Sequence, residues 1–218
     1  MTATESDAAP RSGRRATRHG DSRRDELVHA ASELFADRGY RDTSIAQVAE
    51  RVGVTQQALL YYFGSKAGLL DAVIDDRDGA AVEFAEQLAA VGGAEALRRL
   101  PGAARRNVAD PYLARLFAVL VAENLSPESI AHEHFVQRYR HLREIVAGLI
   151  ADGQRDGVFA ADPEPQLLAT EILATIDGLN TQWLLDPEVD LVAASEQWAA
   201  GLAERLAPRR PTARDARS

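Results

Sequence analysis

Apolar residues recur every three or four positions along most of this 218-residue chain, which is the spacing that places them on one face of a helix. No stretch alternates apolar and polar residues with a period of two, so the sequence predicts no sheet. We therefore expect an all-α fold, with Pro101-Gly102 as a candidate break inside one helix. The expected helices cover residues 22–38, 44–52, 55–63, 66–76, 80–91, 94–109, 111–124, 127–156, 163–185 and 188–206.

Small polar residues and glycines divide the first part of this pattern into short helices. Thr43 or Ser44 can cap the second helix, and Thr55 can cap the third, because a hydroxyl at that position accepts from a free backbone N–H group. Gly53 separates these two helices, since glycine adopts a left-handed turn conformation at no steric cost. Gly64 ends the third helix. The stretch 43–66 thus reads as two short helices joined by a tight turn.

The second of these short helices has a polar outer face, as a DNA-reading helix requires. A helix-turn-helix unit lays its second helix in the major groove, with the first helix braced across the backbone. Glutamine can pair with adenine through two hydrogen bonds, whereas threonine and tyrosine hydroxyls can reach phosphates. Lys66 stands at a helix start, where its ammonium and free backbone N–H groups can address one phosphate. The residues of the outer face are Thr55, Gln56, Gln57 and Tyr61.

Each of these side chains also has an ordinary structural interpretation. Gln56 and Gln57 can be solvated surface residues, and Lys66 can be an unpaired surface charge. Tyr61 can be half-buried packing. Their common spacing on one short helix is what favours the DNA-reading interpretation over these alternatives.

The charge distribution places a positive field beside this motif. The net charge is −8, which argues against a protein that coats nucleic acid indiscriminately. Residues 11–24 nevertheless contain six arginines and one acid. Residues 1–21 lack periodicity, which predicts a disordered basic arm. This arm can be a solvated tail, or it can contact DNA. Its position beside the helix-turn-helix favours contact, with Arg23 and Arg24 at its junction with the first helix.

The segment from about residue 24 to residue 74 resembles the DNA-binding domain of the tetracycline-repressor (TetR) family. The resemblance is carried by three stretches that read AASELFADRGY, DTSIAQVAERVGV and TQQALLYYFGSKAGLLDAV. Together they span nearly the whole three-helix domain. One position departs from the family pattern, because Leu60 stands where a tyrosine is usual, and leucine cannot donate to a phosphate.

The resemblance implies roles for particular residues. Thr55, the two glutamines after it and Tyr61 would face the DNA, while Thr43 and Lys66 would hold phosphates at either end. The complete expected DNA-binding set is Arg23, Arg24, Thr43, Ser44, Thr55, Gln56, Gln57, Tyr61 and Lys66.

The resemblance also implies that the second half is a helical domain with a ligand cavity, which pairs with a second copy through a four-helix bundle. The expected helices 127–156 and 163–185 match the bundle helices in order and length. Small-molecule sites are mostly apolar with a few polar groups. The candidate cavity residues are Phe117, Leu120, Asn124, Phe135, Tyr139, Thr175, Asn180 and Trp183.

These cavity candidates have alternatives that the sequence leaves open. The aromatic residues can be plain core, since large rings dominate cores. Glu123 and Asn124 end an apolar stripe and can be a solvated helix terminus or polar cavity lining. Asp177 lies within an apolar helix and can face the cavity, solvent or a partner subunit.

Other function classes find no support in the sequence. The chain has no cysteine, which excludes disulfides and thiolate metal sites. No catalytic grouping or phosphate-binding loop is readable, and no apolar run approaches the ~18 residues of a membrane span. His132 and His134 would point to different sides of a helix. We expect no enzyme activity, cofactor, metal or membrane association, and a cytoplasmic location.

The sequence therefore predicts a homodimeric repressor that binds a palindromic DNA operator and is released by an unknown small molecule. The alternative is a helical small-molecule- or partner-binding protein that has lost its DNA-binding role. The expected division is a basic arm (1–21), a DNA-binding domain (22–76), a ligand-binding and dimerisation domain (77–207) and a disordered tail (208–218).

Overall fold

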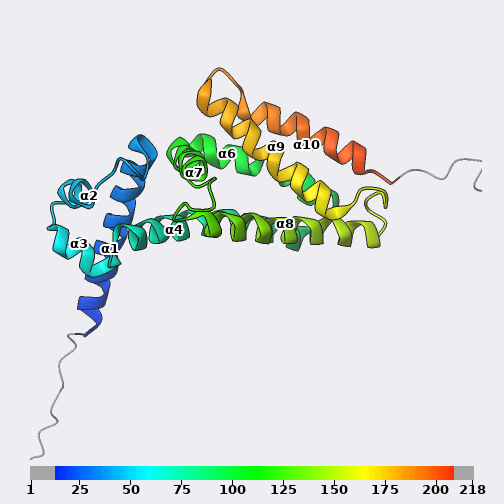
Figure 1. Ribbon diagram of the computed structural model, residues 1–218. Helices are drawn as coiled ribbons and strands as arrows, with labels where there is room; N and C mark the ends of the chain where they lie inside the picture. Colours follow the sequence, from blue (N-terminus) through cyan, green and yellow to red (C-terminus); the bar gives the residue numbers. More distant parts are fainter. Residues whose placement is uncertain (1–12, 209–218) are drawn as a thin grey trace, which may run out of the picture.

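The computed structural model describes residues 13–208, with side chains described for 22–76 and 78–208. Within these residues the chain forms ten α-helices and no strand, which confirms the predicted all-α fold (Figure 1). The helices are α1 (Gly13–Arg38), α2 (Ile45–Val52), α3 (Gln56–Phe63), α4 (Lys66–Val91), α5 (Gly93–Arg99), α6 (Gly102–Ala109), α7 (Pro111–Glu123), α8 (His132–Arg155), α9 (Pro165–Leu185) and α10 (Leu191–Leu206).

Helices α1 to α3 and the beginning of α4 form one packed body, at the left of Figure 1. Its core takes one apolar residue or more from each helix, and Leu27, Phe35, Val48, Leu59 and Leu69 are all buried. Burying side chains of this size stabilises a fold by about 1.5–3 kcal/mol each. The amphipathic spacing that predicted these short helices is therefore the spacing that builds their shared core.

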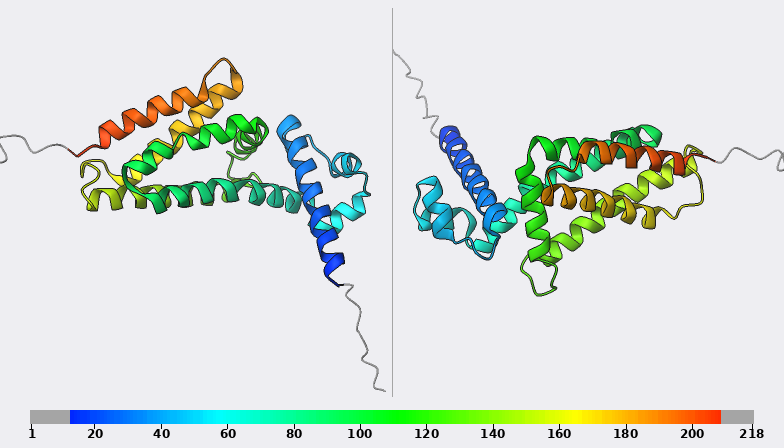
Figure 2. Two further views of the ribbon diagram at one scale, coloured as in Figure 1. Left: turned by 180° about the vertical axis from the view of Figure 1, so that it is seen from behind. Right: turned by 90° about the horizontal axis from the view of Figure 1, so that it is seen from above.

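Helices α4 to α10 form the second body. Helix α8 packs along α9 and beside α4, while α10 covers α5, α6 and α9 (Figures 1 and 2). Its core includes Leu97, Ile150, Ile172 and Leu206, all buried. Helix α7 packs against α1 on one side and against α6 and α9 on the other, so it touches both bodies. Among the described helices, none is long and apolar enough to cross a membrane.

The first helix begins earlier than predicted. Helix α1 extends back to Gly13, so residues 13–21 are helical and do not belong to a disordered arm. No proline interrupts residues 13–38, and arginine and alanine are good helix formers. Residues 1–12, which hold the rest of the predicted arm, and residues 209–218 of the predicted tail lie outside the described residues.

Helix α4 is continuous where the sequence predicted two helices and a domain boundary after residue 76. It runs without a break through Gly79. Asp78 in this polar stretch is held from α8, by the Arg138 Nε atom at 2.7 Å and the His134 Nε2 atom at 2.9 Å. These tertiary contacts outweigh the low helix propensity of glycine. As a result one helix passes from the first body into the second.

Helix α8 begins at His132, later than the predicted residue 127. The side chain of Asn124 organises the preceding loop, because its Oδ1 atom accepts from the Ala131 backbone N–H at 3.0 Å and its Nδ2 atom donates to the Leu120 carbonyl at 2.8 Å. The Ser129 hydroxyl donates to the Glu123 carbonyl at 3.2 Å. These side chains bind backbone groups that a longer helix would use. The predicted break at Pro101 is confirmed, since α5 ends at Arg99 and α6 begins at Gly102.

Candidate DNA-binding surface and ligand cavity

The tight turn between α2 and α3 is fixed by local capping. Ser44 and Gln47 form a reciprocal capping box at the start of α2, with the Ser44 N–H donating to Gln47 Oε1 at 2.7 Å. Gly53 ends α2 at a φ of 71° and a ψ of 35°, a left-handed conformation that glycine adopts without strain. The Thr55 hydroxyl then accepts from the Ala58 N–H at 3.1 Å and starts α3.

The outer face of α3 is open to solvent. Gln56 and Gln57 are exposed, and neither side chain has a hydrogen-bond partner among the described residues. Tyr61 is 86% exposed, whereas Leu59 on the opposite side is fully buried. A tyrosine this exposed on a short helix is free to meet a ligand or nucleic acid. Leu60, at the position where the family usually has tyrosine, is 39% exposed and presents only carbon to the surface.

Thr43 does not occupy the position expected of a phosphate-binding residue. It is 1% exposed, and its hydroxyl lies 2.8 Å from the Gly39 carbonyl and 3.2 Å from the Leu34 carbonyl. Since a hydroxyl has one proton to donate, that proton is used inside the corner after α1. Thr43 is therefore a structural residue of the corner, which corrects the expectation from the resemblance.

Lys66 and the two arginines of α1 are partly engaged within the protein. The Lys66 Nζ atom donates to the Arg41 carbonyl at 3.3 Å and lies 4.3 Å from the centre of the Tyr40 ring. Burial lowers the pKa of this amine, and nearby Glu123 partly offsets the effect. Arg23 pairs with Glu26 at 2.7 Å, and Arg24 lies over the Phe63 ring. Of these side chains, Arg24 lies beside α3 through Phe63, and Lys66 begins the helix that follows it.

A carboxylate from the second body holds the corner after α1. Glu123, the last residue of α7, accepts from the Tyr40 N–H at 2.7 Å and from the Arg41 N–H at 3.3 Å. Neighbouring Gly39 has a φ of 83°, which favours glycine, and a Cβ atom there would lie 2.7 Å from Glu123 Oε1 and displace the carboxylate. Glu123 is thus neither a free helix terminus nor a cavity residue: it connects α7 to the base of the first body.

Tyr112 lies at the other end of the contact between α7 and α1. Its ring packs edge-on against His29, with 6.4 Å between ring centres. Its hydroxyl is buried and has no hydrogen-bond partner among the described residues. Burial raises the pKa of this phenol, and the negative charges of Glu33 and Asp37 raise it further. A buried hydroxyl without a partner costs free energy.

We expect Tyr112→Phe to leave the free energy of unfolding unchanged or raise it by about 1 kcal/mol, because the change removes only the unpaired hydroxyl. Tyr139→Phe is the matched control, since the Tyr139 hydroxyl donates to Asp177 at 2.6 Å and its loss should lower stability. Denaturant unfolding of both variants measures this difference. Equal losses of stability in the two variants would contradict it.

The second body encloses a cavity of about 400 Å³, within the size range of small-molecule sites. Its walls come from α4, α6, α7, α8 and α9. Leu125 and Thr181 line the cavity and are exposed, so it opens to solvent beside them. The apolar lining residues are Ala80, Ala81, Phe84, Ala85, Leu88, Leu100, Ala103, Ala114, Phe117, Ala118, Val121, Ala122, Leu125, Leu142, Val146, Ile172, Leu173 and Ile176.

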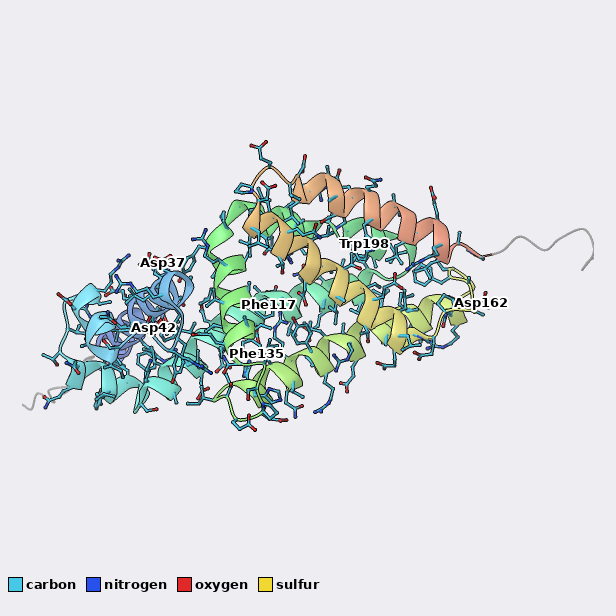
Figure 3. The ribbon with its side chains drawn as sticks, turned by 45° about the horizontal axis from the view of Figure 1, so that its top comes forward. Asp37, Asp42, Phe117, Phe135, Asp162 and Trp198 are labelled. Atoms are coloured by element: carbon cyan, nitrogen blue, oxygen red, sulfur yellow. The ribbon has the colours of Figure 1, made fainter. Side chains whose placement is uncertain are left out.

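Three of the predicted cavity residues line it, namely Phe117, Tyr139 and Asn180. Figure 3 places Phe117 on the inner side of α7. The other five do not line it. Leu120 and Phe135 are buried in the core shared with the first body, Asn124 holds the loop before α8, and the Thr175 hydroxyl donates to the Glu171 carbonyl. Trp183 is half-buried on α9 outside the cavity lining.

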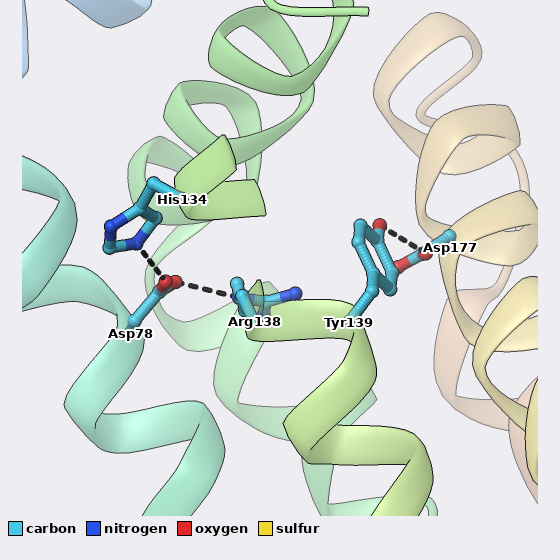
Figure 4. A network of polar contacts seen from close by, with 5 residues as sticks. All are labelled: Asp78, His134, Arg138, Tyr139 and Asp177. Carbon is cyan, nitrogen blue, oxygen red and sulfur yellow. Dashed lines mark hydrogen bonds and ion pairs between the residues drawn. The ribbon is translucent and has the colours of Figure 1, made fainter. Parts of the chain in front are cut away.

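Two groups of polar contacts meet the cavity at Arg138, Tyr139 and Asp177, and Asp78 holds Arg138 from outside the lining (Figure 4). Asp78 accepts from Arg138 at 2.7 Å, and the Tyr139 hydroxyl donates to Asp177 at 2.6 Å. Burial raises the pKa of Asp177, and the hydrogen bond from Tyr139 and the charge of Arg138 oppose this shift. Burial and the charge of Asp177 raise the pKa of Tyr139.

The polar cavity residues that sequence reasoning missed are Arg106, Asn107, Arg138 and Thr181. Asn107 on α6 donates to Asn180 on α9 at 2.8 Å. Arg106 lies 3.7 Å from the centre of the Phe84 ring, and burial lowers its pKa. A weak signal was present in the sequence, because Arg138 interrupts the side of α8 that carries Phe135 and Leu142.

Each of the two bodies matches a known family of regulators. Residues 27–73 match the model of bacterial regulatory proteins of the tetR family, and residues 94–208 match that of the BetI-type transcriptional repressor C-terminal region. The chain is 28% identical over 195 residues to the probable HTH-type transcriptional regulator ArpR of Pseudomonas putida, covering 85% of this chain and 91% of that protein. It is 27% identical to the HTH-type transcriptional regulator TtgR, also of Pseudomonas putida, with the same coverage.

A solved structure shares the fold. The transcriptional regulator FadR from Bacillus subtilis, in complex with stearoyl-CoA, superposes with a TM-score of 0.71 at 22% identity. The match covers 83% of this chain and 98% of that one. The order of helices in the present chain is therefore that of a known two-body regulator fold.

Proposed function

The chain belongs to the TetR family of bacterial transcriptional regulators, and we propose that it is a homodimeric repressor that a small molecule releases from a palindromic operator. Family membership makes it a DNA-binding regulator that responds to a ligand. The outer face of α3, with Gln56, Gln57 and Tyr61, is its base-reading and phosphate-contacting surface. The cavity of the second body takes the effector.

The observation that carries this proposal is the continuity of α4. The helix starts at Lys66 in the DNA-binding body, and between Ala80 and Leu88 it forms a wall of the cavity. A ligand that fits the cavity better in one position of α4 favours that position. It can change DNA affinity only as far as its own affinity differs between the two positions of α4. Glu123 supplies a second connection, since α7 lines the same cavity.

An exposed stripe on α9 supports pairing with a second copy. Its members recur at three- and four-residue spacing and are small or apolar, with Leu167 72% exposed and Leu185 81% exposed. Apolar faces of this kind on a helix pair form bundles between subunits. Two recognition helices would then be held about one DNA turn apart. The exposed members of the stripe are Leu167, Thr170, Ala174, Thr181 and Leu185, and Gly178 between them is half-buried.

A gel-shift assay with the DNA upstream of its own coding region tests this function. We expect a discrete complex with the mass of a dimer on one duplex, which competitor DNA of scrambled sequence does not remove. Binding to neither the upstream DNA nor any selected duplex would overturn the proposal and favour a helical binding protein without a DNA role.

A further inference from the structure

Arg138 is a buried cation on the cavity wall with donors to spare. Its side chain is 8% exposed, and among the described residues Asp78 is its only hydrogen-bond partner, through Nε at 2.7 Å. Figure 4 shows the far end of the guanidinium pointing away from Asp78, toward the space beside Tyr139. A guanidinium offers five N–H donors in a fixed fork. Its terminal nitrogens can therefore serve a group inside the cavity.

Aromatic stacking holds this guanidinium in place. Its central carbon lies 4.1 Å from the centre of the Phe117 ring and 5.3 Å from that of Tyr139. Stacking uses the flat face of a guanidinium and leaves its edge free for planar acceptors such as carboxylates. The donors are thus oriented before any ligand arrives, which lowers the entropic cost of binding.

The cavity carries a second cation, Arg106 on α6. Its guanidinium carbon lies 3.7 Å from the centre of the Phe84 ring, the charge of nearby Glu83 acts on it, and it forms no ion pair among the described residues. The single acid on the cavity wall, Asp177, is already engaged with the Tyr139 hydroxyl. Asp78 offsets Arg138 from outside the cavity, where it also contacts His134. Cations thus outnumber acids among the groups that line the space.

The rest of the lining is apolar over five helices. Such a surface selects a ligand with a large apolar body, because removing apolar surface from water is favourable in proportion to the area that is buried. A ligand with a charge at one end would place that charge where donors already point and leave its body among alanine, leucine, isoleucine and phenylalanine side chains.

We propose that the effector is an apolar molecule with one anionic head group, of carboxylate type, which the terminal N–H groups of Arg138 bind. This inference rests on the proposed function of the cavity and specifies its ligand class. Arg106, which lines the same cavity from α6, supplies a second, weaker attraction for the same charge. An apolar amine would instead bring its cation to a lining that holds two guanidinium groups, where the one acid among the described lining residues, Asp177, is already engaged.

Three probes of equal chain length test this inference, namely decanoate, 1-decanol and decylamine, titrated into the full-length protein by calorimetry at neutral pH. We expect decanoate to bind about tenfold more tightly than 1-decanol, with decylamine weakest. Equal affinity for acid and alcohol, tighter binding of the amine, or no binding of any probe would overturn the proposal. DNA binding by the ligand-free protein is measured separately, so the proposed function can stand when this inference fails.

Arg138→Gln should reduce the preference for decanoate over 1-decanol to about twofold or less while retaining affinity for the alcohol. Arg138→Lys keeps a cation for Asp78 but loses the fork, so an intermediate preference is expected. If the Gln variant does not fold, the Lys variant still tests the role of Arg138. The matched control is Arg140→Gln, because Arg140 is exposed on the same helix and, among the described residues, bonds only to Gln137. An unchanged preference in both Arg138 variants would show that another group binds the head.

Discussion

Gln57→Ala is expected to lower affinity for the operator by about 1–3 kcal/mol while leaving affinity for unrelated DNA unchanged. Gln57 is exposed on the outer face of α3 and has no partner among the described residues, so its amide is free to pair with a base edge. The lost affinity should come from one base pair in each half-site. Operators with the original or a substituted base pair at that position should bind the variant equally well. Fluorescence anisotropy with operator and scrambled duplexes at fixed salt measures both affinities.

Tyr61→Phe provides the contrasting result. Tyr61 lies one turn beyond Gln57 on the same face of α3 and is 86% exposed. If its hydroxyl donates to a phosphate, the variant loses affinity for operator and scrambled DNA by the same factor. Gln197→Ala, an exposed glutamine on α10, is the control for surface substitution. Equal loss of discrimination in the Gln57 and Tyr61 variants would refute this division of roles.

Glu123→Ala should uncouple the two bodies. The carboxylate accepts two backbone N–H groups of the corner after α1, and hydrogen bonds to a charged group are worth about 1.5–3 kcal/mol. Without these two hydrogen bonds, a movement of α7 on ligand binding no longer displaces that corner. We expect faster hydrogen exchange at the Tyr40 and Arg41 amides and a smaller change in operator affinity when a cavity ligand is added.

The control for this experiment is Glu133→Ala, because Glu133 is exposed on α8 and its side chain bonds only to Gln137 within the part of the chain that the structure describes. Glu123→Gln keeps one acceptor oxygen and should give an intermediate effect. Slow exchange at Tyr40 together with full ligand response in the Ala variant would show that coupling passes through α4 alone.

The DNA-binding body was predictable because its signals are local. Ser44 and Thr55 cap the helices that the sequence assigned to them, and Gly53 adopts the left-handed turn conformation expected of it. A cap and its acceptor lie within three residues of each other, so composition and spacing suffice. The exposed positions of Gln56, Gln57 and Tyr61 follow from the same short-range periodicity.

The second body was less predictable because its contacts join distant residues. Glu123 binds backbone groups 82 and 83 positions away, and Arg138 binds Asp78 over 60 positions. Periodicity identifies the buried face of α8 but not which neighbour an arginine on that face will meet. For the same reason Leu120 and Phe135, which share the aromatic and aliphatic character of cavity residues, belong to the core between the two bodies.

The boundary errors have a related cause. The sequence predicted the end of one helix at residue 76 and the start of another at residue 127, yet α4 continues through residue 79 and α8 begins only at His132. Asp78 is held from α8, whereas Asn124 and Ser129 bond to the loop backbone itself. The outcome depends on which partner each polar side chain finds, and that is a tertiary property.

Selection of bound duplexes from a random DNA pool by the purified full-length protein tests the central claim most directly, namely that two copies of α3 read one operator. We predict enrichment of an inverted repeat whose half-sites lie about one helical turn apart, roughly 10 base pairs or a multiple of it. The double variant Gln57→Ala, Tyr61→Ala should fail to enrich it. Recovery of an unchanged pool by the wild-type protein, or of the same repeat by the double variant, would contradict this account.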